Sequence, residues 1–190
     1  MSEDEKQREL AQAQDALQKS FVYLAGHLGV SDPSAEYQPI DYMKDELGMR
    51  HFRLQQVYNG LRVFGEHLIV HIAKEGDVRD ATGRYRQSVA GMDTEPKLEP
   101  AEAIEIARKD LAVEPSEEFS AELLIYPMHE SGKNHLAYLV TMPIWQGDMP
   151  MRLRYFVDAG TGEIILRYND QTVTGEATST RGIARRLMGQ

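Results

Sequence analysis

The chain has 190 residues, of which 42% are hydrophobic and 27% are charged, a composition typical of a soluble globular protein. Its formal net charge of −9 argues against a nucleic-acid-binding protein, because such proteins present a basic surface to the phosphates. The chain contains no cysteine, which excludes disulfides, thiolate metal sites and cysteine nucleophiles.

No apolar run approaches the roughly 20 residues that a membrane-spanning helix requires, so we expect no membrane partner. The first residues, Met1 to Lys6, are acidic and lack the apolar core of a signal peptide. The residues thus leave two alternatives, a cytoplasmic protein or a chain trimmed of its leader.

The first half of the chain predicts one long helix followed by a small antiparallel sheet. Residues 2–28 predict the helix, because large apolar side chains recur at steps of seven, four, three and four. They form one stripe: Leu10, Leu17, Phe21, Leu24 and Leu28. Residues 31–48 contain two prolines and predict a loop with one helical turn at 42–47.

Residues 49–58 and 61–73 predict two strands joined at Asn59-Gly60, the strongest short-range signal for a β-hairpin. Strict alternation along the second strand puts four apolar side chains on one face: Phe64, Leu68, Val70 and Ile72. Arg62 and Glu66 share that face, so we expect it to be buried over its second half only. A third strand is expected at 78–84, closed by Gly83.

The second half repeats this order with a different sequence. A polar linker is expected at 86–97, and Pro100 begins a second helix. Four strands follow, with a longer loop at 144–150; they are 121–126, 135–142, 152–158 and 163–168. The predicted fold class is α+β, with two helix-on-antiparallel-sheet subdomains and an extended C-terminal tail. The predicted domains are residues 1–94, 95–170 and 171–190.

Candidate sites for chemistry are few. His67 and His71 lie four apart on a strand, about 13 Å along the backbone, which is too far for both to bind one metal ion unaided. His129 and His135 lie on either side of a predicted turn. A zinc-protease motif requires two histidines four residues apart on one face of a helix, so it is not indicated. We expect the Asp158 carboxylate to accept a hydrogen bond from the backbone of its own turn rather than to act with Glu163 in acid–base catalysis.

The hairpin resembles a known module. The run Arg50-His-Phe-Arg-Leu-Gln-Gln-Val-Tyr-Asn-Gly-Leu-Arg-Val-Phe-Gly-Glu-His-Leu-Ile-Val-His71 is similar to the FTP domain, the fungalysin/thermolysin propeptide module. The matching positions agree in order and spacing: Arg50, Gln56, Gly60, Val63, Phe64, Gly65 and His71. The resemblance implies an FTP-like subdomain in the first half.

The second half resembles a PepSY domain, which has a cystatin-like arrangement of a helix on a sheet. Residues 98–107 look like its opening helix, and residues 155–165 look like its hairpin, with Asp158 and Gly162 at the turn. Together, the two resemblances cover residues 45–170 and match the order of a propeptide of a thermolysin-like zinc metalloprotease.

This resemblance implies an intramolecular chaperone and inhibitor without catalytic residues or a cofactor of its own. Its partner would be the zinc metalloprotease catalytic domain, in cis or in trans, and its location secreted or periplasmic. The family places the C-terminal segment in the protease cleft. The corresponding residues here are Arg181, Gly182, Ile183, Ala184, Arg185, Arg186, Leu187 and Met188.

Two other hypotheses remain open at this point. The chain would be a standalone binding module that inhibits a protease in trans or interacts with another protein. Alternatively, it would be an enzyme with a pocket between helix and sheet, using Asp158 or a histidine as the base. A sheet face filled by apolar side chains would remove the enzyme hypothesis.

Overall fold

The computed structural model describes residues 3–30, 32–112, 118–146 and 149–170. The chain divides into two compact units, residues 1–91 and 92–190. Each unit places a helix on an antiparallel sheet, so the α+β class expected from the sequence is confirmed.

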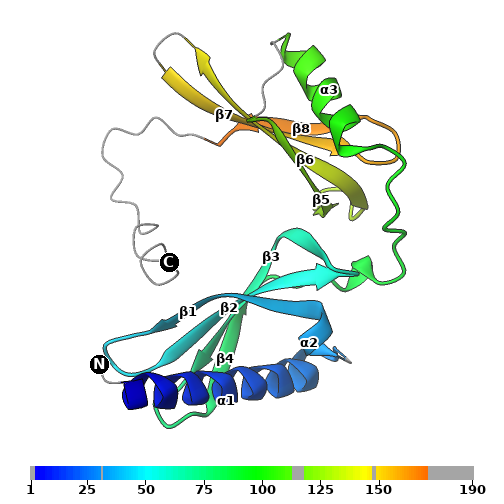
Figure 1. The fold of residues 1–190 in the computed structure, drawn as a ribbon. Helices are drawn as coiled ribbons and strands as arrows, with labels where there is room; N and C mark the ends of the chain where they lie inside the picture. Colours follow the sequence, from blue (N-terminus) through cyan, green and yellow to red (C-terminus); the bar gives the residue numbers. More distant parts are fainter. Residues whose placement is uncertain (1–2, 31, 113–117, 147–148, 171–190) are drawn as a thin grey trace. The chain divides into compact units, whose positions relative to one another are not determined.

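In the first unit a long helix lies along one face of a four-stranded sheet (Figure 1). The strands pair antiparallel in the order β1-β2-β3-β4. The elements are α1 (Glu3–Leu28), α2 (Pro33–Glu36), β1 (Tyr37–Lys44), β2 (Arg50–Tyr58), β3 (Leu61–Ile72), β4 (Val78–Gly83) and the short 3-10 helix η1 (Gln87–Val89).

The apolar face of α1 forms the core of this unit with the sheet. Leu24 is fully buried, and Ala16 and Phe21 are almost fully buried. They pack with Phe52 and Val70 from the two central strands. Leu10 was predicted to belong to the same stripe, but it is 61% exposed. The apolar stripe that reaches the sheet therefore begins later in the helix, near Ala13.

The predicted loop over residues 31–48 is wrong, because this segment contains α2 and the whole of β1. β1 is an edge strand that pairs with β2, with an irregularity between Pro39 and Asp41. Proline is tolerated on an edge strand, because only one side of such a strand needs its backbone N–H groups. The predicted helical turn at 42–47 is likewise wrong: its first half continues the strand and Asp45–Gly48 is a turn.

The predicted face pattern of β3 is also wrong over its first half. From Arg62 to His67 the strand advances five residues, while its partner β2 advances only two, from Val57 to Gln55. The excess of three is odd, and an odd insertion moves the following side chains to the other face. Val63 and Glu66 are consequently buried, at 0% and 2% exposure.

In the second unit one helix lies on a face of a sheet in the order β5-β6-β7-β8 (Figure 1). The elements are α3 (Pro100–Leu111), β5 (Ser120–Pro127), β6 (Asn134–Gln146), β7 (Met149–Asp158) and β8 (Ile164–Asn169). The predicted loop at 144–150 is wrong, since β6 and β7 continue into it and pair as far as Gln146 and Met149.

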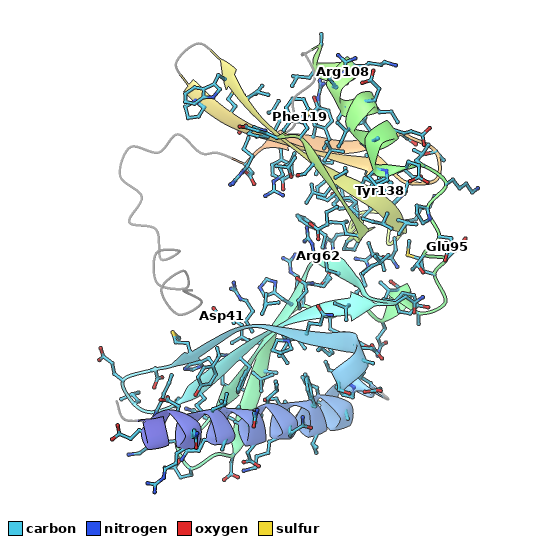
Figure 2. All side chains as sticks on the ribbon, viewed as in Figure 1. Asp41, Arg62, Glu95, Arg108, Phe119 and Tyr138 are labelled. Atoms are coloured by element: carbon cyan, nitrogen blue, oxygen red, sulfur yellow. The ribbon has the colours of Figure 1, made fainter. Side chains whose placement is uncertain are left out.

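The helix α3 begins as the sequence indicated, with Pro100 in its first turn. Glu99 caps it, and the Glu102 carboxylate accepts the Glu99 backbone N–H at 2.8 Å, completing a capping box. Tyr138, labelled in Figure 2, lies on β6 and donates its hydroxyl to the Leu98 carbonyl at 2.8 Å. This bond fixes the segment that leads into the helix.

Candidate functional site

The predicted protease-contact residues 181–188 lie outside the part of the chain that the structure describes. The candidate site is therefore built from the other positions singled out in the sequence, which fall on the β2–β3 hairpin and on the β7–β8 turn. Specific side-chain hydrogen bonds stabilise both regions.

The β2–β3 hairpin turns at Asn59 and Gly60, as predicted. Both residues have positive φ, 49° and 79°. A two-residue turn with this backbone matches the right-handed twist of the flanking strands, and asparagine followed by glycine adopts it at low cost. Beyond the turn, Phe64 is only partly buried, with the Arg62 guanidinium 5.5 Å from the centre of its ring.

The irregular part of β3 surrounds Gly65, whose φ of 75° lies in the left-handed region. Three backbone carbonyl oxygens of this region surround one side-chain amide. The Gln55 side-chain amide lies within hydrogen-bonding distance of these oxygens: 3.0 Å to Gln56, 2.7 Å to Val63 and 2.9 Å to Glu66. Gln55 was not singled out from the sequence, but it stabilises the irregular region that reorients β3.

Gln56 is fully buried and binds a distant segment. Its amide nitrogen donates to the Arg86 carbonyl at 2.9 Å, and its oxygen accepts the Arg86 backbone N–H at 2.9 Å. This pair of bonds mimics one rung of a sheet. It holds the chain just after β4 against β2.

Arg50 connects the sheet to the long helix. Its side chain is 8% exposed, and Nη2 donates to the Gln12 side-chain oxygen on α1 at 2.7 Å. Burial raises the pKa of the neighbouring Tyr42 hydroxyl, and the positive charge of Arg50 opposes this effect. The first residue of the family pattern thus has a structural role between α1 and β2.

His71 contacts His51 on the adjacent strand, with Nδ1–Nδ1 at 2.8 Å and the rings edge to face. Sequence reasoning compared His71 with His67 and missed this pair. A regular hairpin that turns at 59–60 would place His51 opposite Leu68, because the paired numbers sum to 119. The three extra residues in β3 move the partner to His71.

Gly83 ends β4 with a φ of 128°, and its position is determined by a close approach of two backbones. A Cβ atom there would lie 2.2 Å from the His67 carbonyl oxygen. The same oxygen accepts the Arg84 N–H at 2.9 Å. Glycine is the one residue that allows this approach without a steric clash.

In the second unit, Asp158 closes the β7–β8 turn. One oxygen accepts the backbone N–H groups of Gly160 and Thr161, both at 2.9 Å, which confirms the predicted bond within the turn. The other lies 2.9 Å from His135 Nδ1, a contact that sequence reasoning missed. Burial by itself would raise the pKa of Asp158, but His135 and the backbone donors outweigh burial and lower it.

Gly162 completes this turn with a φ of 77°. A Cβ atom at this position would lie 3.0 Å from Ile106 Cδ1, so the glycine allows the turn to approach α3. The Glu163 side chain is exposed, and the contact between Glu163 and Asp158 is a backbone bond of 2.8 Å. The predicted preference for a structural Asp158 over a paired acid and base is consistent with this geometry.

The polar groups at these positions have structural partners rather than an open reaction site. Among the described residues, no three histidine or acidic side chains are grouped so that they could hold a metal ion. The helix-facing side of the second sheet is filled by Tyr138, Val140, Met142 and Tyr155 rather than hollowed into a pocket. This arrangement removes the support for the enzyme hypothesis at this face.

Comparison with known families bears directly on the first unit. Residues 35–85 match the model of FTP, the Fungalysin/Thermolysin Propeptide Motif. The chain contains an FTP motif. The motif runs from the end of α2 through strands β1 to β4, and it includes every position that the sequence resemblance had singled out in the first half.

Relatives with similar sequences carry protease names. Bacillolysin of Brevibacillus brevis is 35% identical over 133 residues, which are 65% of this chain and 25% of that protein. Bacillolysin of Bacillus subtilis (strain 168) is 29% identical over 188 residues, 93% of this chain and 36% of that protein. Thermolysin of Alicyclobacillus acidocaldarius subsp. acidocaldarius is 29% identical over 163 residues, 76% of this chain and 29% of that protein.

The chain therefore spans between 25% and 36% of the length of these three relatives. Among solved structures, the Bacillus megaterium YpeB C-terminal domain aligns with a TM-score of 0.40 and 15% identity, covering 84% of this chain and 65% of that one. That similarity is too low to support an inference. The FTP motif ends before the second unit, so the PepSY resemblance of residues 95–170 stays a prediction.

No helix in the described ranges of this FTP-containing chain has the length and apolar character needed to cross a membrane.

Proposed function

We propose that this chain is the propeptide of a thermolysin-like zinc metalloprotease, acting as an intramolecular chaperone and as an inhibitor of the catalytic domain. The observation that carries the proposal is the FTP motif at residues 35–85, together with relatives named bacillolysin and thermolysin that align over most of the chain. In this role the chain performs no catalysis itself, and the zinc belongs to its partner.

In this proposal the three predicted parts of the chain have different tasks. The FTP-containing part, residues 1–94, and the PepSY-like part, residues 95–170, present folded surfaces to the catalytic domain. Such preorganised surfaces reduce the entropy that is lost when a flexible segment binds. Both parts have their own apolar core, which is consistent with a preorganised surface on each.

Residues 171–190 would occupy the protease cleft. An extended segment binds such a cleft through its backbone hydrogen bonds, while alternate side chains fill pockets. The candidate contact residues are the eight from Arg181 to Met188, among which Ile183 and Leu187 supply the bulky apolar groups. Gly182–Ile183 and Arg186–Leu187 are the peptide bonds that we propose for cleavage.

The partner domain would act in cis in a precursor, or in trans after cleavage. A propeptide of this kind acts outside the cytoplasm, so we propose a secreted or periplasmic location. Reading the gene beyond codon 190 tests the cis arrangement: a downstream His-Glu-x-x-His, in which two histidines four apart bind zinc, is the expected result.

Inhibition of a mature protease by the purified chain tests the proposal directly. We expect the 190-residue chain to inhibit the mature Brevibacillus brevis bacillolysin, and a chain ending at residue 170 to inhibit it at least tenfold less well. A variant with Ile183→Gly and Leu187→Gly tests whether the loss is due to the side chains. Full protease activity in excess chain, with circular dichroism showing that the chain is folded, would refute the inhibitor role.

A further inference from the structure

The His51–His71 pair lies on the face of the first sheet that α1 does not cover. Met43, His51, His71 and Asp80 form one row across the four strands. Asp41, in the next row, is labelled on this side of the sheet in Figure 2. The two imidazole side chains are only partly exposed, at 16% and 25%. Nothing in the proposed function uses this pair.

The outer nitrogens of the two rings determine the direction of the hydrogen bond between them. His51 Nε2 lies 3.2 Å from Asp45 Oδ2, and His71 Nε2 lies 3.1 Å from Thr82 Oγ1. A carboxylate only accepts, so His51 must carry its proton on Nε2. In a neutral ring this leaves His51 Nδ1 as an acceptor. His71 therefore donates from Nδ1 and accepts the Thr82 hydroxyl at Nε2.

This chain of hydrogen bonds can accommodate one additional proton. If either ring becomes an imidazolium, the contact between the Nδ1 atoms becomes a charge-assisted bond between one donor and one acceptor. A second proton places a hydrogen on both Nδ1 atoms. Two N–H groups that point at each other cannot remain 2.8 Å apart, so the contact must break.

We propose that the His51–His71 pair is a proton-sensitive latch of the FTP motif, closed while it holds at most one extra proton and opened by the second. This inference concerns the stability of the first unit and does not depend on the proposed function. It follows that acidification loosens the contact between β2 and β3 at the end of the hairpin distant from its turn.

The surrounding charged groups do not remove the conflict that the second proton creates. Asp45 lies against His51, and Asp80 Oδ1 lies 3.9 Å from His71 Nε2. Both carboxylates lie at the outer nitrogens, so neither can separate the two Nδ1 atoms. Asp41 on β1, Arg53 on β2 and His67 on β3 lie on the same face. On β4, the Arg79 guanidinium lies 3.8 Å from Met49 Sδ, two residues from His51.

The sign of the effect follows from the number of protons bound. In the unfolded chain both imidazoles bind a proton below about pH 6.5, whereas the closed pair binds only one. The unfolded state thus binds more protons, and stability falls as the pH falls. One additional proton raises the unfolding equilibrium constant by about tenfold for each pH unit in the acidic range.

Chemical unfolding of the full chain between pH 7.5 and 5.0, at constant ionic strength and with a chelator present, tests the proposal. Hydrogen exchange read by mass spectrometry on β2 and β3 peptides reports the first unit, while the single tryptophan, Trp145, reports the second. We expect the unfolding equilibrium constant of the first unit to rise about tenfold for each pH unit below 6.5. In His71→Gln the number of protons taken up on unfolding should decrease by about one, because the glutamine side-chain oxygen can accept a hydrogen bond from protonated His51.

His67→Gln is the matched control, because His67 lies on the same strand and face outside the pair, and it should retain the wild-type pH dependence. An equal pH dependence in wild type and His71→Gln would overturn the proposal. Nitrogen-15 spectra of the imidazoles at pH 7.5 provide a test without any variant. A hydrogen on His51 Nε2 and on His71 Nδ1 is expected, and the opposite tautomers would also overturn the proposal.

Discussion

At the scale of single residues, three positions of the FTP motif are each determined by one local constraint. Gly83 is required by the approach of the His67 carbonyl, and Gly60 by the turn. Gln56 is required by the two backbone groups of Arg86. Two of these residues are glycines, and the Gln56 amide is engaged with the Arg86 backbone, so a pattern of this kind identifies a fold more directly than an activity.

Gly83→Ala should destabilise the first unit by about 3 kcal/mol or more, because the methyl group meets a backbone oxygen in a strained conformation. Urea unfolding of the full chain measures this change. Gly26→Ala is the control, since a Cβ atom there meets nothing and the residue is helical. That variant should gain about 0.5–1 kcal/mol. Equal effects of the two substitutions would contradict the close approach at Gly83.

Asp158→Asn should cost the second unit about 1–2 kcal/mol at pH 7, because the bond to His135 weakens. The folded-state pKa of Asp158 is lowered, so its stabilising contribution is complete above the unfolded value near 4 and is lost as the pH falls through the folded value. The difference between wild type and variant should therefore shrink toward pH 3, as followed by Trp145 fluorescence. A constant difference from pH 7 to pH 3 would argue against this linkage.

At the scale of elements, the irregular region in β3 is the decisive feature of the first sheet. It moves Glu66 to the buried face, and it brings His71 opposite His51. Gln55 supports it from β2, and Gln56 on the next position attaches the segment after β4. Two adjacent glutamines thus stabilise the two departures from a regular sheet.

Gln56→Ala should destabilise the first unit by about 3 kcal/mol, because both Arg86 backbone groups lose their partner. Thermal unfolding followed by circular dichroism measures the loss. Gln38→Ala, at an exposed position of β1, is the matched control and should change stability by less than about 0.5 kcal/mol. Gln56→Glu keeps the shape of the side chain but removes the N–H donor to the Arg86 carbonyl. If this variant has wild-type stability, the loss in Gln56→Ala is due mainly to the cavity that it creates.

At the scale of the whole molecule, the chain has two separate cores, one under α1 and one under α3. The boundary between the two units in the sequence follows Gly91. Within the first unit, the Tyr58 hydroxyl accepts the Gly91 N–H at 2.8 Å. The segment predicted as a linker begins with the 3-10 helix η1, whose Val89 is buried. The predicted boundary at residue 94 stays a prediction.

A fragment of residues 1–91 should fold by itself, because its helix and sheet bury a complete apolar cluster. We expect a cooperative thermal transition and dispersed amide resonances. The fragment should also show the pH dependence of the full chain, since both histidines of the pair lie within it. A fragment that lacks dispersed resonances at pH 7.5 would show that the first unit depends on the rest of the chain.

Local signals in the sequence were sufficient for most elements and for the FTP motif. The extent of α1, the Asn59-Gly60 turn and Pro100 at the start of α3 each depend on neighbouring residues alone, and all three were predicted correctly. β1 was missed because an edge strand with a proline lacks the alternation that identifies a strand.

By itself, the sequence determined the α+β class, the hairpin and the family to which that hairpin belongs, because short-range spacing encodes turns and periodicity. Tertiary structure alone decided the pairings across strands. His51 meets His71, and His135 meets Asp158, through registers that local spacing does not fix. Three additional residues in β3 change the cross-strand partner of every residue beyond them, because each partner is set by the number of residues counted from the turn on both strands. Since side chains alternate with a period of two, an odd number of additional residues also changes the face on which they lie.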